Sequence, residues 1–233
     1  MPDLTFVAAS GTLGAYVARP EGDGPWPGVV VIQDALGMGD DLRAQADRLA
    51  AGGYLAFAPD LYSGRGLRCV VATIASSRSG KGPAYRDIEA ARQWLAGQED
   101  CTGRIGIIGF CMGGGFALLS APQLDFAAAA VNYGEVPKET ARLAGACPVV
   151  GSYGKRDRAM GGRAARLETA LTELGVRHDV KEYPDAGHSF MNKIGGPRRQ
   201  RLLHVAGAAY HGPSAQDAWA RILAFFDAEL REA

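Results

Sequence analysis

The stretch that decides the fold is Gly106-Ile-Ile-Gly109-Phe-Cys111-Met-Gly113-Gly-Gly115. Here an apolar run ends in Gly-x-Cys-x-Gly, and a segment of helical character follows at once. This order of strand, sharp turn and helix is that of a nucleophile elbow, with sulfur in place of the commoner hydroxyl. Glycine at 109 and 113 lets the neighbouring backbone pass close to a strained turn. We expect Cys111 to be presented to solvent at a helix N-terminus, where the helix dipole favours the reactive thiolate.

Other interpretations of these cysteines and glycines are weaker. A buried free cysteine is a common core residue, and we expect that role for Cys69, Cys101 and Cys147. A dinucleotide-binding loop would need glycine where Cys111 stands, and the Gly-Lys-Ser/Thr ending of a phosphate loop is missing. Because there is no CxxC pair and no Cys/His cluster with zinc-ligand spacing, the sequence predicts free thiols in a reducing compartment, no metal and no cofactor.

Short apolar runs alternate with segments of helical period around this stretch. The run 28–32 is unbroken and β-branched, which is typical of a central strand covered on both faces. We expect further strands at 54–58, 104–109, 127–133, 147–153 and 178–183, and an antiparallel hairpin within 3–19. We expect helices at 41–51, 84–97, 112–120, 162–174 and 214–230. This alternation predicts the α/β class, with a mostly parallel central sheet flanked by helices on both faces.

The whole chain, 1–233, is predicted to form a single domain. The sequence contains no internal repeat, and the loops that contain Gly and Pro are too short to act as linkers. The stretches 62–83 and 193–213 are rich in Gly, Ser and Arg and lack a clear period. Since irregular segments of this length are often lids, we expect lid-like loops there.

Composition and charge exclude several classes of function. Hydrophobic residues make up 47% of the chain, and 25 basic residues balance 25 acidic ones, which is ordinary for a globular protein. A net charge of zero provides no field that would attract nucleic acid or an acidic membrane. The first residues lack the pattern of a signal peptide, and the apolar runs are too short to span a bilayer. We therefore expect a cytoplasmic protein with no nucleic-acid or membrane partner.

A thiol nucleophile of this kind needs a base and a group that orients the base. In this architecture they follow in the chain order nucleophile, acid, histidine. Asp157 follows the expected strand 147–153, and His188 follows the expected strand 178–183. Both loops should open at the sheet edge that carries Cys111, which is where ligands bind in open α/β sheets. The order predicts Asp157 as the acid and His188 as the base.

Competing candidates for these two roles stand in poorer contexts. Asp185 is only three residues from His188 and could more simply cap its own loop, so we favour Asp157. His178 opens a strand at the opposite end of the sheet. His204 and His211 lie in the irregular segment before the last helix. We expect all three histidines to be solvated or locally bonded.

The remaining requirement is an oxyanion hole. This architecture builds it from the N–H of the residue after the nucleophile and from an N–H in the loop after the third strand. Met112 supplies the first N–H. The third strand is 28–32, and the loop Gln33-Asp-Ala-Leu-Gly37 follows it. We therefore expect the second N–H to come from Ala35 or Leu36.

These motifs resemble the dienelactone hydrolase (carboxymethylenebutenolidase) family of the α/β-hydrolase fold over residues 10–230. The matching features are Gly-Phe-Cys-Met-Gly-Gly at 109–114, Pro-Asp-Leu-Tyr at 59–62, Tyr-Gly at 133–134, Gly-x-x-Asp at 154–157 and Ala-Gly-His-Ser-Phe at 186–190. The resemblance implies that Cys111 is the nucleophile, His188 the base and Asp157 the group that orients it. It also implies that Ala35 and Met112 donate the oxyanion N–H groups.

The resemblance further implies an acidic residue before Ala35 that helps to govern the ionisation of the resting thiol. That position holds Asp34, where well-known members carry glutamate. It also implies an arginine, four residues after the histidine, that holds a substrate carboxylate, and here that position is Asn192. One hypothesis is that a nearby basic residue supplies the anion contact instead, and the alternative is a solvated basic loop. The candidates are Lys193, Arg198, Arg199 and Arg201.

Together these residues predict a cofactor-independent hydrolase of small lactones or activated esters. The Cys111 thiolate would attack the carbonyl and form a thioester, and water activated by His188 would release the acid. Two alternatives stay open: a thioesterase or small amide hydrolase with the same triad, and a non-catalytic binding protein on the same fold. We expect a small-molecule lactone or ester as the partner, and a monomer or homodimer.

Overall fold

A single mixed sheet of eight strands runs through the computed structural model, which describes residues 4–63, 67–158, 161–193, 195 and 208–231. The strand order is β1-β2-β4-β3-β5-β6-β7-β8. The strands are β1 (Leu4–Ala8), β2 (Gly11–Ala18), β3 (Trp26–Ile32), β4 (Leu55–Pro59), β5 (Cys101–Phe110), β6 (Ala128–Asn132), β7 (Val149–Gly154) and β8 (His178–Tyr183). Strand β2 pairs antiparallel with β1 and with β4, and all other neighbours are parallel.

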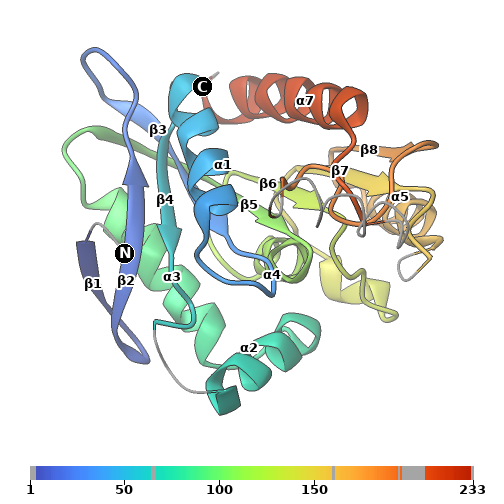
Figure 1. The fold of residues 1–233 in the computed structure, drawn as a ribbon, viewed down its shortest axis with the longest axis horizontal. Helices are drawn as coiled ribbons and strands as arrows, with labels where there is room; N and C mark the ends of the chain where they lie inside the picture. The colour runs from blue at the N-terminus through green and yellow to red at the C-terminus, as the bar shows by residue number, and fades with distance from the viewer. Residues whose placement is uncertain (1–3, 64–66, 159–160, 194, 196–207, 232–233) are drawn as a thin grey trace.

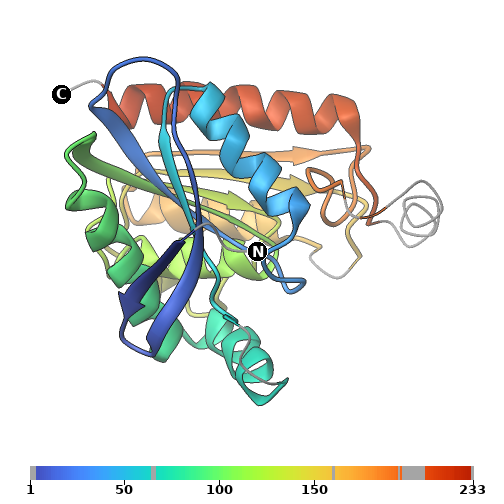
Figure 2. The same ribbon diagram turned by 60° about the vertical axis from the view of Figure 1, so that its left-hand side comes forward.

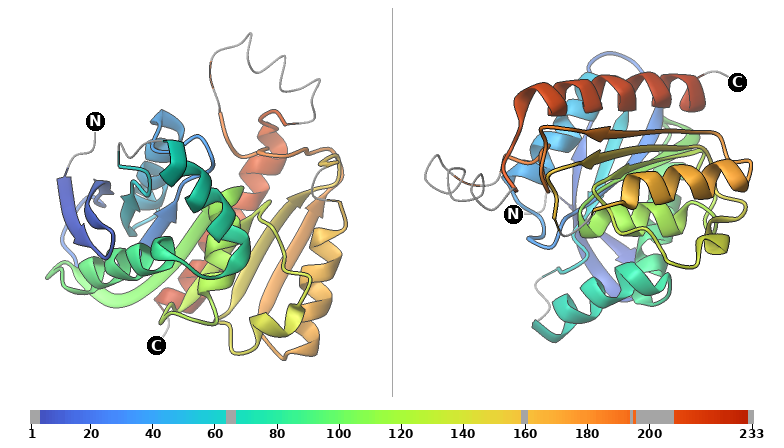
Figure 3. Two further views of the ribbon diagram at one scale, coloured as in Figure 1. Left: turned by 90° about the horizontal axis from the view of Figure 1, so that it is seen from below. Right: turned by 90° about the vertical axis from the view of Figure 1, so that its right-hand side faces the viewer.

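Helices cover both faces of this sheet, as Figures 1 and 2 show. They are α1 (Asp40–Ala51), α2 (Leu67–Ser79), α3 (Pro83–Ala96), α4 (Met112–Ser120), α5 (Arg163–Glu173) and α7 (Gly212–Leu230), with a 3-10 turn, η1, at Thr140–Leu143. Helices α1 and α7 pack on one face, and α3, α4 and α5 pack on the other (Figure 3). None of the helices in the described ranges is long and apolar enough to cross a membrane.

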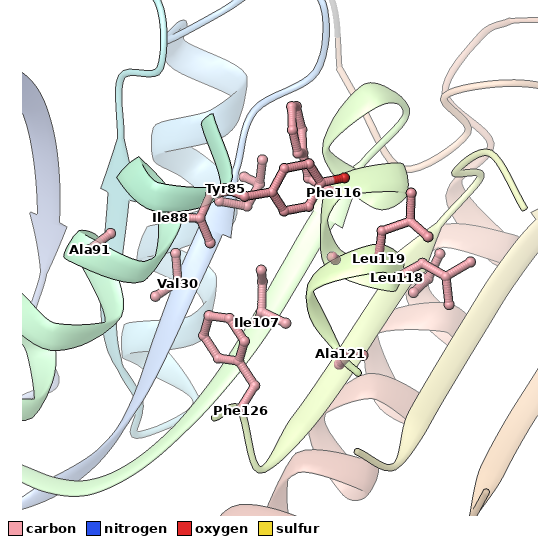
Figure 4. Close-up of a cluster of buried hydrophobic side chains, with 14 of the residues drawn as sticks. Val30, Tyr85, Ile88, Ala91, Ile107, Phe116, Leu118, Leu119, Ala121 and Phe126 are labelled. Carbon is pink, nitrogen blue, oxygen red and sulfur yellow. The ribbon is translucent and has the colours of Figure 1, made fainter. Parts of the chain in front are cut away.

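The unbroken apolar run of β3 follows from this two-sided burial. Val30 and Ile32 point into the core under α3 and α4, whereas Val29 and Val31 point into the core under α1 and α7. All four side chains have no exposed surface. Figure 4 shows Val30 near Ile88 and Ile107 in the first of these two cores. A central parallel strand needs apolar residues at every position because successive side chains alternate between two buried faces.

The predicted α/β architecture is confirmed, with a mostly parallel sheet and helices on both faces. The expected hairpin is the β1–β2 pair, in which Ala8 faces Gly11 across the turn. The other six predicted strands and the five predicted helices are present, with ends shifted by a few residues at most. The order of chain elements therefore places Cys111, Asp157 and His188 after parallel strands.

The prediction of a lid-like loop over 62–83 is wrong for most of this stretch, because Leu67–Ser79 form helix α2. This helix lacks an apolar period because its buried positions include Thr73 and Ser77. The hydroxyl groups of Ser76 and Ser77 donate hydrogen bonds to carbonyl oxygens three residues earlier, at Thr73 and Ile74. Local bonding of this kind lets serine face inward without a distant partner, so the hydrophobic pattern is lost although the helix remains.

The second lid-like loop, predicted over 193–213, lies mainly outside the described residues. Positions 194 and 196–207 belong to that undescribed part. Helix α7 begins at Gly212, two residues before its predicted start and inside the stretch predicted as a loop. The prediction for the remainder stays a prediction.

Candidate active site

The turn between β5 and α4 holds Cys111 in the conformation that an elbow requires. Its φ of 54° and ψ of −113° are unusual for a residue with a side chain. The Cys111 N–H donates to the carbonyl of Asn132 at 3.0 Å, which anchors the turn to β6. A Cβ on Gly109 would overlap the Gly113 carbonyl, and a Cβ on Gly113 would overlap the carbonyl of Ile32. The two glycines are therefore required for the close backbone approach, as predicted.

The structure brings Cys111, His188 and Asp157 together. The Nε2 atom of His188 lies 3.1 Å from Cys111 Sγ, and its Nδ1 atom lies 2.5 Å from Asp157 Oδ2. The three residues come from loops after β5, β8 and β7, which are parallel and end at one sheet edge. Cys111 is partly exposed and Asp157 is buried. This geometry matches a nucleophile, a base and a buried acid that orients the base.

The charge state of His188 is set by its two partners. Burial by itself would lower the pKa of this imidazole. The hydrogen bonds with Asp157 and Cys111, together with their negative charges, outweigh burial and raise the pKa of His188 to about 10. An imidazolium within 3.1 Å of the sulfur stabilises a thiolate at that position. The geometry therefore places a protonated ring within hydrogen-bond distance of the sulfur at neutral pH.

The competing acid and histidines lie elsewhere. Asp185 is exposed and forms an ion pair with Arg156 at 2.6 Å. His178 opens β8, and its Nδ1 lies 2.7 Å from the carbonyl oxygen of Val176. His211 precedes α7, where its Nδ1 lies 2.8 Å from Ser214 Oγ. His204 lies outside the described residues.

The other described cysteines have no comparable partner at the site. Cys101 and Cys147 are free thiols, like Cys111. Burial raises the pKa of Cys101, and burial raises the pKa of Cys147 to about 12. Both groups are therefore protonated at neutral pH, as expected of structural cysteines. For Cys69 the side chain lies outside the described part, so its predicted role stays a prediction.

The loop after β3 distinguishes the two candidates for the second oxyanion donor. The Leu36 N–H donates to the Asp34 side chain, with Leu36 N 2.7 Å from Asp34 Oδ1. This local turn uses the Leu36 amide and leaves Ala35 as the candidate in this loop. Met112 is the first residue of α4, and the first N–H groups of a helix have no partner within the helix. Ala35 and Met112 are thus the pair that the geometry favours.

Tyr62 was missed as a site residue because it appeared in the sequence only as part of a motif. Its hydroxyl donates to the Ala35 carbonyl at 3.2 Å and lies 3.7 Å from Met112 Sδ. Burial, and next the charges of Asp34 and Cys111, raise the pKa of Tyr62 to about 12, so the hydroxyl keeps its proton. Tyr62 therefore connects the two residues that carry the candidate oxyanion donors.

Asp34 belongs to the loop 33–37, which we call the oxyanion loop, and its side chain is partly buried. Burial raises the pKa of the Asp34 carboxyl, the Leu36 amide opposes that rise, and the charge of Asp41 adds to it. The positive charge of His188 acts in the opposite direction and lowers the pKa of Asp34. Its placement is compatible with an electrostatic influence on the thiol–imidazole pair.

A cavity of about 370 Å³ opens beside the oxyanion loop. This volume is within the range of small-molecule sites. Leu36 is 61% exposed at this cavity, which is unusual for a large apolar side chain and provides an apolar contact surface. The other side chains that line it are Asp34, Asp40, Asp41, Leu42, Asn192 and Lys193.

Asn192 occupies the position where the family resemblance implies an arginine, and it is buried. Its Oδ1 accepts a hydrogen bond from the Tyr133 hydroxyl, and its Nδ2 donates to Asp41 at 2.6 Å. The Lys193 ammonium lies 5.0 Å from the centre of the Tyr210 ring and lines the cavity. Sequence reasoning missed Tyr133 and Asp41, since no local pattern predicts that they meet Asn192.

The remaining basic candidates, Arg198, Arg199 and Arg201, lie outside the described residues. The hypothesis that one of the four basic residues contacts an anion therefore stays a prediction. No group of three or more His, Cys, Asp or Glu side chains within the described ranges is arranged to hold a metal ion.

Comparisons with known proteins show the family and the fold of this chain. The sequence model described as "Dienelactone hydrolase family" matches residues 13–230. A protein of Escherichia coli (strain K12) named "Putative carboxymethylenebutenolidase" is 34% identical over 245 residues, covering 96% of this chain and 85% of the relative. A crystal structure from Klebsiella pneumoniae, described as a "Putative Dienelactone Hydrolase", has a TM-score of 0.75 at 29% identity and covers 95% of both chains.

A further solved structure is a dienelactone hydrolase-like promiscuous phosphotriesterase from metagenomic libraries. It has a TM-score of 0.81 at 23% identity and covers 97% of this chain and 96% of its own. At that identity the likeness shows the shared fold alone.

Proposed function

Because the chain belongs to the dienelactone hydrolase family and has its α/β-hydrolase fold, we propose that it cleaves small lactones or activated esters with Cys111 as the nucleophile. A dienelactone hydrolase-like hydrolase is the function that the family supports. The observation that carries the finer proposal is the 3.1 Å separation of Cys111 Sγ and His188 Nε2, with His188 Nδ1 on Asp157.

In the first step the Cys111 sulfur attacks the carbonyl carbon of the substrate. The negative charge that develops on the carbonyl oxygen is stabilised by the N–H groups of Met112 and Ala35. When the tetrahedral intermediate collapses, the ester C–O bond breaks and His188 Nε2 donates its proton to the leaving oxygen. The high pKa of His188 in the resting pair means that the ring enters this step already protonated. The product is a thioester on Cys111.

In the second step the neutral ring of His188 accepts a proton from water. The resulting hydroxide attacks the thioester, and collapse of the second intermediate expels the Cys111 thiolate and releases the acid. Asp157 fixes the ring by bonding to Nδ1 and stabilises its charged form. The neighbouring Asp34 is an auxiliary group whose charge acts on the same ion pair.

A cavity of about 370 Å³ lies next to the oxyanion loop, has room for a lactone ring or a short ester, and offers apolar contact at Leu36. Its lining contains neither Cys111 nor His188, so the proposal rests on the triad and not on this cavity. A thioester or small amide would react through the same atoms, and a substrate panel separates these classes. A non-catalytic binding protein would not need the bonded triad, which is why hydrolysis is the preferred function.

The test is hydrolysis of p-nitrophenyl acetate by the Cys111→Ala variant. We expect turnover to be lost while the circular dichroism spectrum and melting temperature stay close to those of the wild type. Cys101→Ser is the matched control because Cys101 begins the same strand at its other end, and this variant should keep wild-type turnover. Turnover retained by Cys111→Ala would refute the assignment of the nucleophile.

A further inference from the structure

A chain of hydrogen bonds, buried at Tyr133 and Asn192 and more open at Asp41, begins beside the His188 ring. The Tyr133 hydroxyl donates to Asn192 Oδ1, and Asn192 Nδ2 donates to Asp41 Oδ2 at 2.6 Å. The other oxygen of Asp41 accepts the Lys193 N–H at 2.6 Å. Tyr133 has no exposed surface, and Asn192 is 4% exposed. Since buried polar groups are costly unless they are paired, this chain is a specific structural feature and not an incidental contact.

One end of the chain contacts the His188 ring directly. The ring of Tyr133 packs edge-on against it, with 5.4 Å between ring centres. Tyr133 follows β6 with a φ of 42°, a left-handed conformation that costs free energy for a residue other than glycine. Among the described residues, the other non-glycine positions with positive φ are Ser63, Cys111 and Ser189. The backbone strain at Tyr133 coincides with the placement of its ring beside the base.

The other end of the chain lies at the start of α1, the helix that follows the oxyanion loop. Asp41 lies in the first turn of α1, which begins at Asp40 directly after the loop that contains Ala35. A second bond joins the same two elements, since Gln45 Nε2 of α1 donates to the Met191 carbonyl at 3.0 Å. The segment 188–193 and the start of α1 are therefore tied at several points. These bonds therefore connect the segment that carries His188 to the helix that follows the oxyanion loop.

The chemistry of Asn192 suits this position. Its amide can accept a hydrogen bond at Oδ1 and donate one at Nδ2, whereas a carboxylate only accepts and leucine does neither. The pKa of Tyr133 is raised well above its usual value, chiefly by burial and next by the charge of Asp41, so its hydroxyl remains a donor. Each link in the chain thus has one defined direction, from Tyr133 to Asn192 to Asp41.

We propose that Tyr133, Asn192 and Asp41 form a positioning clamp that holds the His188 ring and the oxyanion loop in register with the Cys111 sulfur. None of the three needs to touch the reacting atoms. The clamp rests on the proposed hydrolytic function and deepens it. It assigns to Asn192 a role in holding the base, in place of contact with a substrate anion.

The first test compares Tyr133→Phe, Asn192→Leu and Asp41→Asn with the wild type. We expect kcat for p-nitrophenyl acetate, per titrated Cys111 thiol, to fall by about 10–100-fold, because misplacing a catalytic group by about 1 Å costs up to this much. KM should change far less, since this substrate is small. If kcat per thiol stays at the wild-type value in all three variants, the clamp is refuted, whatever happens to their melting temperatures.

The second test exchanges the two partners. Asn192→Asp alone places two carboxylates against each other, and we expect a loss of kcat. In the double variant Asp41→Asn/Asn192→Asp, the carboxylate at 192 accepts from the Tyr133 hydroxyl and from the amide at 41, and that amide oxygen accepts the Lys193 N–H. The same three bonds can therefore form. We expect kcat to recover to within about threefold of the wild type, as for neighbours that are energetically coupled. A double variant no better than the worse single variant would contradict the proposal.

Asp87→Asn is the matched control for stability. Asp87 is a buried carboxylate, 3% exposed, that accepts the Ser10 N–H at 2.9 Å and the Ser10 hydroxyl, and it lies on α3 away from the triad. This variant should lower the melting temperature and leave kcat per thiol unchanged. The alkylation rate of Cys111 by iodoacetamide separates the two proposals. If the wild type hydrolyses no ester, the function fails, and slower alkylation in the clamp variants would still support the clamp.

Discussion

The two ends of strand β5 place a cysteine in opposite environments. Cys101 begins the strand, where burial raises the pKa of its thiol. Cys111 follows the last residue of the strand, in a left-handed turn, 3.1 Å from His188 Nε2. The same side chain on one strand is thus protected at the amino end and paired with an imidazole at the carboxyl end. The difference shows that reactivity here comes from position at the sheet edge, because only the carboxyl ends of parallel strands gather loops from β7 and β8.

The largest expected effect is a direct contrast between the thiols. We expect iodoacetamide at pH 7 to alkylate Cys111 at least about 10³-fold faster than Cys147, because the thiolate is the reactive form and the pKa of Cys147 is about 12. Peptide mass spectrometry of the partly labelled protein measures both rates, with Cys101 as a second slow reference. If Cys111 and Cys147 are alkylated at similar rates, the proposed difference in reactivity between Cys111 and the structural cysteines is wrong.

A smaller effect should appear in the pH dependence of stability. The folded pKa of His188 is about 10, above the value of 6.5 for an unperturbed histidine. Its contribution to stability is therefore complete below pH 6.5 and is lost as the pH rises through about 10. We expect the free energy of unfolding to fall over this window by on the order of 2 kcal/mol more in the wild type than in His188→Gln. Urea denaturation at several pH values measures this difference.

The His188→Gln variant removes the titrating group, so the titrations of residues that do not contact His188 cancel in the comparison. Parallel pH curves for the two proteins would mean that His188 does not hold its proton more tightly in the folded chain. That result would contradict the raised pKa of His188 and would make the environments of Cys101 and Cys111 more alike than the geometry indicates.

The smallest effect concerns the support of the oxyanion loop. Tyr62→Phe removes the hydroxyl that bonds to the Ala35 carbonyl and contacts Met112. The loss of one such hydrogen bond is worth about 1 kcal/mol, so we expect kcat for p-nitrophenyl acetate to fall by about fivefold with little change in KM. Stopped-flow acylation and steady-state turnover give both values. A kcat equal to that of the wild type would mean that Tyr62 does not support the donor at Ala35.

Helix α2 shows where the sequence was insufficient for the fold. The strands and the other helices could be predicted because apolar residues recur along them with the period of a buried face. In α2 the buried positions include Thr73 and Ser77, and serine hydroxyl groups bond to the helix's own carbonyls. Hydrophobic periodicity depends on a contrast between apolar and polar residues. It therefore cannot detect a helix whose buried face is polar and bonded to the helix's own backbone.

At the candidate site, the sequence by itself determined the elbow around Cys111 and the order of Cys111, Asp157 and His188, because these features depend on neighbours in the chain. The residues themselves left Ala35 and Leu36 open, and the family resemblance implied Ala35. The tertiary structure adds a physical reason, because the Leu36 amide is bonded to the Asp34 side chain.

The tertiary structure also decided that Asn192 bonds to Tyr133, 59 positions away, and to Asp41, 151 positions away. Such contacts arise when packed layers bring distant loops to one edge of the sheet. No local pattern encodes them, since the physical partner of each group is chosen by the fold of the whole chain.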